Sequence, residues 1–179
     1  MRKGEVLGLT WDCIDFSRGT ILIDKQLQRP RQGDGKCILV TTKNSKSRKL
    51  KPAKEVMNGL YRVKKQQMTW QLKNGESFQN PMNLVFTHEL GEYLNPNTVY
   101  NHFKEIVKRI GAPELRFHDM RHSYAVASLQ IGDDVKTVQS NLGHATAAFT
   151  LDVYGHVTDQ MKEESANRME RFIHIVKGA

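Results

Sequence analysis

Residues 115–154 of the chain read LRFHDMRHSYAVASLQIGDDVKTVQSNLGHATAAFTLDVY and collect side chains suited to binding a phosphate group. His118 and Arg121 are three residues apart, so one helical turn places both on the same face. A helix N-terminus at this point adds backbone N–H groups that favour an anion. His144 and Tyr154 follow within the same run of helical pattern and short turns. Two imidazoles, a guanidinium and a phenol gathered in this way favour a phosphodiester over a metal ion or a carbonyl.

The first helix of this stretch is predicted from its apolar spacing and its end signals. Asp119 is the expected N-cap, because its carboxylate can accept a hydrogen bond from the first turn. Tyr124, Ala127 and Ile131 recur at helical spacing and are expected to face the core. Gly132 is expected to end the helix.

Two further short helices are predicted downstream. The first runs from about 134 to 142 and ends at Gly143, which places His144 in a turn and not in a core. The second covers about 146–153 and leads directly into Tyr154.

Three strings in this stretch resemble the C-terminal signature of the tyrosine recombinase (phage integrase) family. They are HDMRH at 118–122, LGH at 142–144 and TLDVYGHV at 150–157. Each string alone is a weak signal, but three in order at compatible spacings make a strong one. The resemblance directs attention upstream, to the family's first catalytic arginine and its hairpin lysine.

Arg2 matches the first catalytic arginine of the family. The residues that fit the surrounding motif are Arg2, Glu5, Leu7, Leu9, Trp11, Asp12, Ile14 and Asp15. Without the downstream strings, Arg2 would be read as a solvated charge at the chain end. Glu5 is expected to orient its neighbours or the backbone and to take no part in the chemistry.

Lys43, in TTKNSKSRK at 41–49, is the best match to the hairpin lysine of the family. Lys46 is the runner-up, because the turn can align one to three residues differently. Taken alone, a lysine in so basic a run is a solvated or phosphate-touching side chain.

The resemblance implies metal-independent cleavage and rejoining of double-stranded DNA through a 3′-phosphotyrosyl intermediate, with no cofactor. Phosphoryl transfer needs charge stabilisation at the phosphate oxygens, and a guanidinium can clamp two of them. The implied roles are nucleophile for Tyr154, general acid for Lys43, and phosphate stabilisation for Arg2, His118, Arg121 and His144. Two alternatives stay open, namely a type IB topoisomerase-like enzyme and a catalytically silent DNA-binding fragment or regulator.

The resemblance also implies a partial recombinase, because helical sequence before the first arginine and a DNA-clamping domain are missing. Residues 1–179 are therefore expected to be an N-terminally truncated catalytic domain, in which Arg2 lies near a fraying end. DNA binding is expected to be weak and salt-dependent. A full-length protein would act as a tetramer on DNA, whereas this domain alone is expected to be monomeric.

The overall charge agrees with a nucleic-acid partner. The 179 residues carry a formal net charge of +8, with basic residues spread along the whole chain. Dispersed basic residues on a folded body favour a surface that meets a polyanion, although a merely soluble basic protein fits the charge as well. The length suits one domain with one sizeable core.

Cys13 and Cys37 are the two cysteines, and they form no CxxC pair. This usage favours a reducing compartment. The resemblance to the recombinase family further implies a cytoplasmic, nucleoid-associated bacterial protein. No apolar run approaches the roughly 18 residues that would span a bilayer. The seven histidines include no H-E-x-x-H motif, so no metal site is expected.

The expected fold is α+β and mostly helical, with a small antiparallel three-stranded sheet packed at the edge of the helical domain. Its strands are predicted at 19–24, 36–42 and 48–51, and the opening residues 1–16 read as the tail of a helix. Longer helices are predicted from Pro52 near N1 to about 72, from an Asn95 cap to 110, and from 158 to 176.

Overall fold

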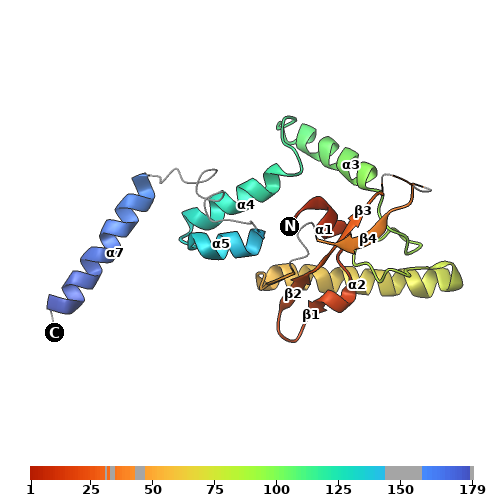
Figure 1. The fold of residues 1–179 in the computed structure, drawn as a ribbon, viewed down its shortest axis with the longest axis horizontal. Helices are drawn as coiled ribbons and strands as arrows, with labels where there is room; N and C mark the ends of the chain where they lie inside the picture. Colours follow the sequence, from red (N-terminus) through yellow and green to blue (C-terminus); the bar gives the residue numbers. More distant parts are fainter. Residues whose placement is uncertain (31, 33–34, 43–46, 144–158, 178–179) are drawn as a thin grey trace. The chain divides into compact units, whose positions relative to one another are not determined.

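The structure is a computed structural model that describes residues 1–30, 32, 35–42, 47–143 and 159–177 (Figure 1). The chain divides into two compact units, Met1–Arg121 and His122–Ala179. The predicted α+β, mostly helical architecture is confirmed, and the described strands form two small antiparallel sheets. No described helix combines the length and the apolar character that a membrane crossing requires.

The described helices and strands follow one another along the chain in this order: α1 (Lys3–Leu7), β1 (Ile14–Asp15), β2 (Thr20–Ile23), β3 (Lys25–Gln28), β4 (Ile38–Thr41), β5 (Arg48–Leu50), α2 (Lys54–Asn74), α3 (Pro96–Arg109), α4 (Asp119–Gln130), α5 (Val135–Leu142) and α7 (Asp159–Lys177). Short 3₁₀ turns lie at Trp11–Cys13 and Gly75–Ser77.

The strands pair differently from the single three-stranded sheet that the sequence predicted. Strands β1, β2 and β5 form one antiparallel sheet, and β3 pairs with β4 in a separate two-stranded ladder. The predicted strand at 19–24 ends at Ile23, and β3 begins at Lys25 in the other ladder. The chain therefore changes sheets at Asp24. β5 returns to β2, with Ile21 opposite Leu50.

The expectation that residues 1–16 form a helix tail is wrong beyond Leu7. Gly8 explains why, because a Cβ added there would lie 2.3 Å from the backbone nitrogen of Leu27 in β3. After this close approach the backbone is extended, and Leu9 accepts a hydrogen bond from Val85 N at 2.8 Å. A longer helix would lose this contact and strand β1.

The core of the first unit lies between α2 and the three-stranded sheet. Met57 and Leu60 of α2 pack with Ile21 and other buried side chains of the sheet. On α2, Val56 is half exposed, whereas Met57 is buried. The helix also starts at Lys54, so Pro52 precedes it and does not occupy N1.

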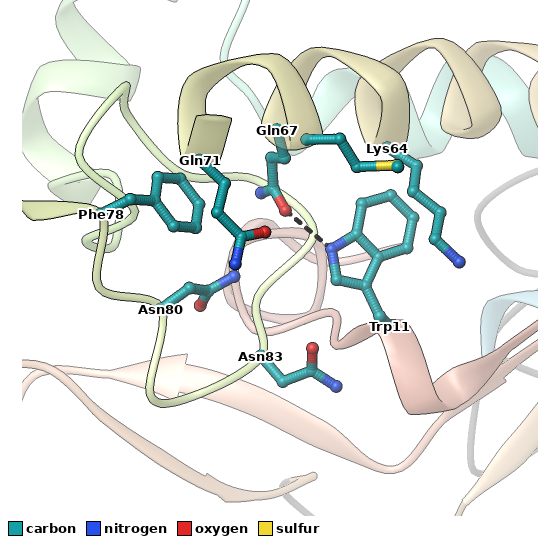
Figure 2. A pocket seen from close by; sticks show the side chains of 8 residues that line it. Trp11, Lys64, Gln67, Gln71, Phe78, Asn80 and Asn83 are labelled. Carbon is teal, nitrogen blue, oxygen red and sulfur yellow. Dashed lines mark hydrogen bonds between the residues drawn. The ribbon is translucent and has the colours of Figure 1, made fainter. Parts of the chain in front are cut away.

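A buried amide ties α2 to the chain beyond it. Gln67 lies with its Nε2 within 3.1 Å of the carbonyl oxygens of Leu84 and Val85, and it also reaches Thr87 Oγ1. Its Oε1 accepts a 2.8 Å hydrogen bond from the indole of Trp11 (Figure 2). One side chain therefore fixes three segments that are distant in sequence.

The predicted helix ends are largely confirmed. Asn95 caps α3 by accepting from Asn97 N at 2.9 Å. Asp134 caps α5 in the same way, and Gly143 ends α5 with a φ of 64°. Gly111, with a φ of 74°, follows the end of α3. In α7 the apolar side chains of Met169, Phe172 and Val176 are exposed.

Replacing Gly8 with alanine tests the close approach between α1 and β3. We expect Gly8→Ala to lower the free energy of unfolding by roughly 1–3 kcal/mol, because backbone atoms of β3 must move. Gly59→Ala is the matched control, since Gly59 lies inside α2 and its added Cβ would meet nothing closer than 3.9 Å. It should raise stability by roughly 0.5–1 kcal/mol. Urea unfolding of both variants measures the difference, and equal shifts would contradict this account of Gly8.

Candidate active site

The structure describes three of the predicted site residues, Arg2, His118 and Arg121, all in the unit Met1–Arg121. The other predicted residues lie outside the described part of the chain. These are Lys43 with its alternative Lys46, His144 and Tyr154, together with the predicted helix at 146–153.

Arg2 is held in place by Glu5 at the start of α1. The backbone nitrogen of Arg2 donates to Glu5 Oε2 at 2.8 Å, and its Nη1 donates to Oε1 at 2.9 Å. The Arg2 side chain remains 36% exposed. Its guanidinium is therefore both oriented and accessible, and Glu5 has the orienting role that the sequence predicted.

Arg48 is the second cation on the same carboxylate, and the sequence reasoning missed it. Its Nη2 donates to Glu5 Oε2 at 2.6 Å and its Nη1 to Oε1 at 3.1 Å, so the pair is bidentate. Glu5 is 1% exposed and Arg48 10%. The available signal was strand alternation, which places Arg48 on the same side as Leu50. An arginine on an inward-facing position requires a buried carboxylate partner.

Glu5 is ionised at neutral pH in this setting. Burial acts to raise its pKa, but hydrogen bonds from Arg48 and Arg2 outweigh burial and lower the pKa to about 2. Two guanidiniums then face one carboxylate, which leaves a net positive charge on the cluster. This charge can attract an anion at the accessible Arg2.

Arg121 lies in the first turn of α4 and is only 4% exposed. Its backbone nitrogen donates to the carbonyl oxygen of His118 at 3.0 Å, and His118 itself is exposed just before the helix. Burial, and then the positive charge of Arg121, lower the pKa of the Met1 amino group to about 6.

Asp119 is the first residue of α4, whereas the sequence predicted it as the cap before the helix. Its carboxylate turns back to Arg116 and accepts from the backbone nitrogen at 2.8 Å and from Nη2 at 2.8 Å. This pair closes the turn that contains His118.

The predicted buried face of α4 is wrong. Tyr124 is 43% exposed and Ile131 81% exposed, so neither is in the core. The buried positions are instead Arg121, Ala125, Ser128 and Leu129. Tyr124 accepts a hydrogen bond from Asn141 Nδ2 of α5 at 3.0 Å, and this polar contact keeps its hydroxyl at the surface.

The cysteines and acidic residues supply no metal cluster within the described ranges. No group of three or more His, Cys, Asp or Glu side chains there could hold a metal ion. Cys13 and Cys37 are both free and buried. Burial raises the pKa of the Cys13 thiol, so this thiol is a poor nucleophile.

Comparison with known proteins places the chain in a family. A sequence model of the phage integrase family matches residues 1–161, which include every candidate residue from Arg2 to Tyr154. The chain therefore belongs to the phage integrase family, the tyrosine recombinases, as its motifs predicted.

Two relatives and one solved structure illustrate the similarity. The chain is 29% identical to a tyrosine recombinase XerC-like protein of Caldanaerobacter subterraneus, over 94% of this chain and 46% of that protein. It is 26% identical to the ICEBs1 integrase of Bacillus subtilis, over 95% of this chain and 45% of that protein. Its fold resembles the Tn1549 transposon integrase in complex with transposon right end DNA, with a TM-score of 0.73 at 24% identity, covering 95% and 55% of the two chains. The chain thus spans about half the length of these relatives.

The Glu5 cluster predicts a specific loss of stability in acid. A carboxylate whose pKa is lower in the folded state contributes stability above its unfolded pKa and loses it as the pH falls. Between about pH 4.5 and about pH 2, the free energy of unfolding should therefore fall by about 3 kcal/mol because of Glu5.

Chemical denaturation of the parent and of Glu5→Gln over this pH range measures the effect. The Gln variant should be less stable at neutral pH and should lack this part of the acid loss. Glu55→Gln, at an exposed ion pair with Arg62, is the control and should show the same loss of stability in acid as the parent. An unchanged acid profile in Glu5→Gln would show that Glu5 is not the responsible group.

Proposed function

We propose that this chain is the strand-transferring domain of a site-specific DNA recombinase, acting in the integration or excision of a phage or mobile element. The observation that carries the proposal is the family match over residues 1–161, because it spans all the candidate catalytic residues. Relatives named as integrases of ICEBs1 and of transposon Tn1549 support the role in mobile elements.

The proposed reaction exchanges one phosphodiester bond for another. The phenol of Tyr154 loses its proton to water, and its oxygen attacks the scissile phosphorus, forming a tyrosyl–phosphate bond as the bond from phosphorus to the 5′ oxygen breaks. Lys43 donates the proton that the departing 5′ oxygen takes up. Attack by a 5′ hydroxyl on the tyrosyl phosphate reverses these steps, so rejoining needs no nucleotide hydrolysis.

Arg2 and Arg121 are proposed to stabilise the charge on the non-bridging phosphate oxygens, assisted by His118 and His144. For Arg2 the support is geometric. Arg2 donates to Glu5 from Nη1 and from its backbone nitrogen, whereas Arg48 donates to the same carboxylate from both Nη1 and Nη2. A guanidinium fixed before the substrate arrives has little reorganisation to undergo in the transition state.

Double-stranded DNA is the proposed partner. The net charge of +8 and the accessible guanidinium of Arg2 both favour a polyanion. We also propose that the full-length protein acts as a tetramer on DNA in the bacterial nucleoid, and that this chain alone is a monomer.

Replacing the nucleophile is the direct test of the proposal. We expect Tyr154→Phe to abolish covalent attachment to a nicked duplex carrying a candidate attachment site, because the attacking oxygen is gone. Duplex affinity should change little. Tyr124→Phe is the matched control, since Tyr124 is an exposed tyrosine that bonds Asn141. It should still form the adduct.

The adduct is measured by denaturing gel electrophoresis and mapped by mass spectrometry. An adduct that persists in Tyr154→Phe would refute the assignment of the nucleophile. A parent chain that binds duplex without forming any adduct would instead identify a silent DNA-binding domain.

A second variant tests the charge stabilisation. Arg121→Lys keeps the charge but loses the planar fork, so the rate of adduct formation should fall by roughly 10²–10³. Arg62→Lys, at an exposed ion pair on α2, should leave the rate unchanged. Single-turnover cleavage at saturating protein measures both rates, and a fewfold change in Arg121→Lys would make Arg121 a structural cation.

A further inference from the structure

A cationic pocket lies at one end of the three-stranded sheet, away from Glu5. It opens between the β1–β2 turn and the start of α2, and its volume is about 470 Å³. Arg18, Lys51 and Lys54 supply its charge, and Phe16 and Tyr61 supply its apolar wall. None of the described residues that line it is acidic. We call it the β-turn pocket.

The sheet itself brings these cations together. β2 and β5 are antiparallel, with Ile21 opposite Leu50, so the turn before β2 and the connection after β5 lie at the same end. Arg18 and Lys51 therefore converge on one opening from distant positions in the sequence. Arg18 lies 3.7 Å from Asp15, but both side chains are exposed, and such a pair is weak.

Two further lysines extend the positive rim along α2. The ammonium of Lys64 lies 5.4 Å from the centre of the Phe16 ring, and that of Lys65 lies 5.0 Å from the centre of the Tyr61 ring. The two rings pack edge to face with centres 6.0 Å apart. Because ammonium groups already occupy ring faces, the rings are poorly placed to stack on bases. The site therefore favours phosphate over an unpaired base.

A second pocket on α2 has a different lining, with fewer cations than the β-turn pocket. That pocket is lined by Trp11 and Phe78 and is dominated by amides (Figure 2). Among the described residues that line it, Lys64 is the one cation. Its amide groups come from Gln67, Gln71, Asn80 and Asn83. A lining of neutral amides offers little attraction to a polyanion.

We propose that the β-turn pocket binds a backbone phosphate of duplex DNA, as a contact separate from the candidate active site. The proposal rests on the proposed function, because it takes DNA as the partner. β5 leads from Arg48, beside Glu5, to Lys51 at the pocket, a rise of about 10 Å. Measured along the axis of a duplex, this distance corresponds to about three base pairs. The pocket therefore binds the duplex near the cleavage point and contributes affinity without sequence preference.

The test removes two pocket charges and compares the salt dependence of duplex binding. The pocket variant is Lys51→Gln with Lys54→Gln, and the control is Lys73→Gln with Lys108→Gln, which removes equal charge from exposed positions. Lys73 lies on the same helix as Lys54, about 28 Å further along. All four lysines are exposed, so thermal unfolding should show the parent's midpoint in both variants.

Fluorescence anisotropy with a labelled duplex over a salt series supplies the readout. The slope of log K against log salt should become shallower by about 0.9 in the pocket variant, the value for one phosphate contact. The control should keep the parent's slope. Equal slopes in all three proteins, or the same loss in both variants, would overturn the proposal.

Two further measurements distinguish duplex binding from single-strand binding, and failure of the pocket proposal from failure of the proposed function. A loss confined to a single-stranded oligonucleotide of the same length would overturn the duplex proposal in favour of an unpaired strand. Covalent attachment to the nicked duplex is measured in parallel. If the parent forms the adduct but the slopes are equal, the pocket proposal fails while the proposed function stands. If the parent neither binds duplex nor forms the adduct, both fail.

Discussion

The buried carboxylate of Glu5 is the constraint on which the first unit depends. A buried charge is costly unless paired, and Glu5 meets this cost only because Arg2 and Arg48 both donate to it. Helix α1 has five residues, too few to be stable alone. The pairing therefore joins a marginal helix to strand β5, 43 residues away in sequence. Without Arg48, Glu5 would keep a single, partly exposed partner.

The same pairing prepares Arg2 for an anionic partner. If Glu5 faced only one arginine, the two opposite charges would cancel, and the pair would attract a phosphate only weakly. Here Arg48 satisfies both oxygens of Glu5, so one positive charge is left over at the less buried guanidinium, Arg2. Structural stability and charge for binding thus come from one cluster. This shared origin explains why the R-x-x-E spacing of Arg2 and Glu5 is informative in the sequence.

The sequence correctly predicted structural features that depend on a few neighbouring residues, such as the ends of helices. The Asn95 cap and the stop at Gly143 depend on local hydrogen bonds and backbone angles, and both are confirmed. The errors involve distant partners. The end of α1 is set by contact of Gly8 with β3, and β5 pairs with β2 across a separate hairpin. Motif spacing singled out Arg2, His118 and Arg121 as candidates, whereas Arg48 was missed because strand alternation does not identify its distant partner, Glu5.

The basic residues of this unit therefore divide according to their neighbours. Arg48 pairs with the carboxylate of Glu5, and Lys25 Nζ lies 3.0 Å from Asp12 Oδ2. The charges of these two side chains are therefore neutralised by carboxylates within the fold. Lys51 and Lys54 line a pocket that has no acidic residue among its described lining residues, so no lining carboxylate pairs with their charges. Net charge alone cannot make this distinction, because it counts both groups equally. The position of each cation relative to the carboxylates is what separates a structural charge from one available to the proposed DNA partner.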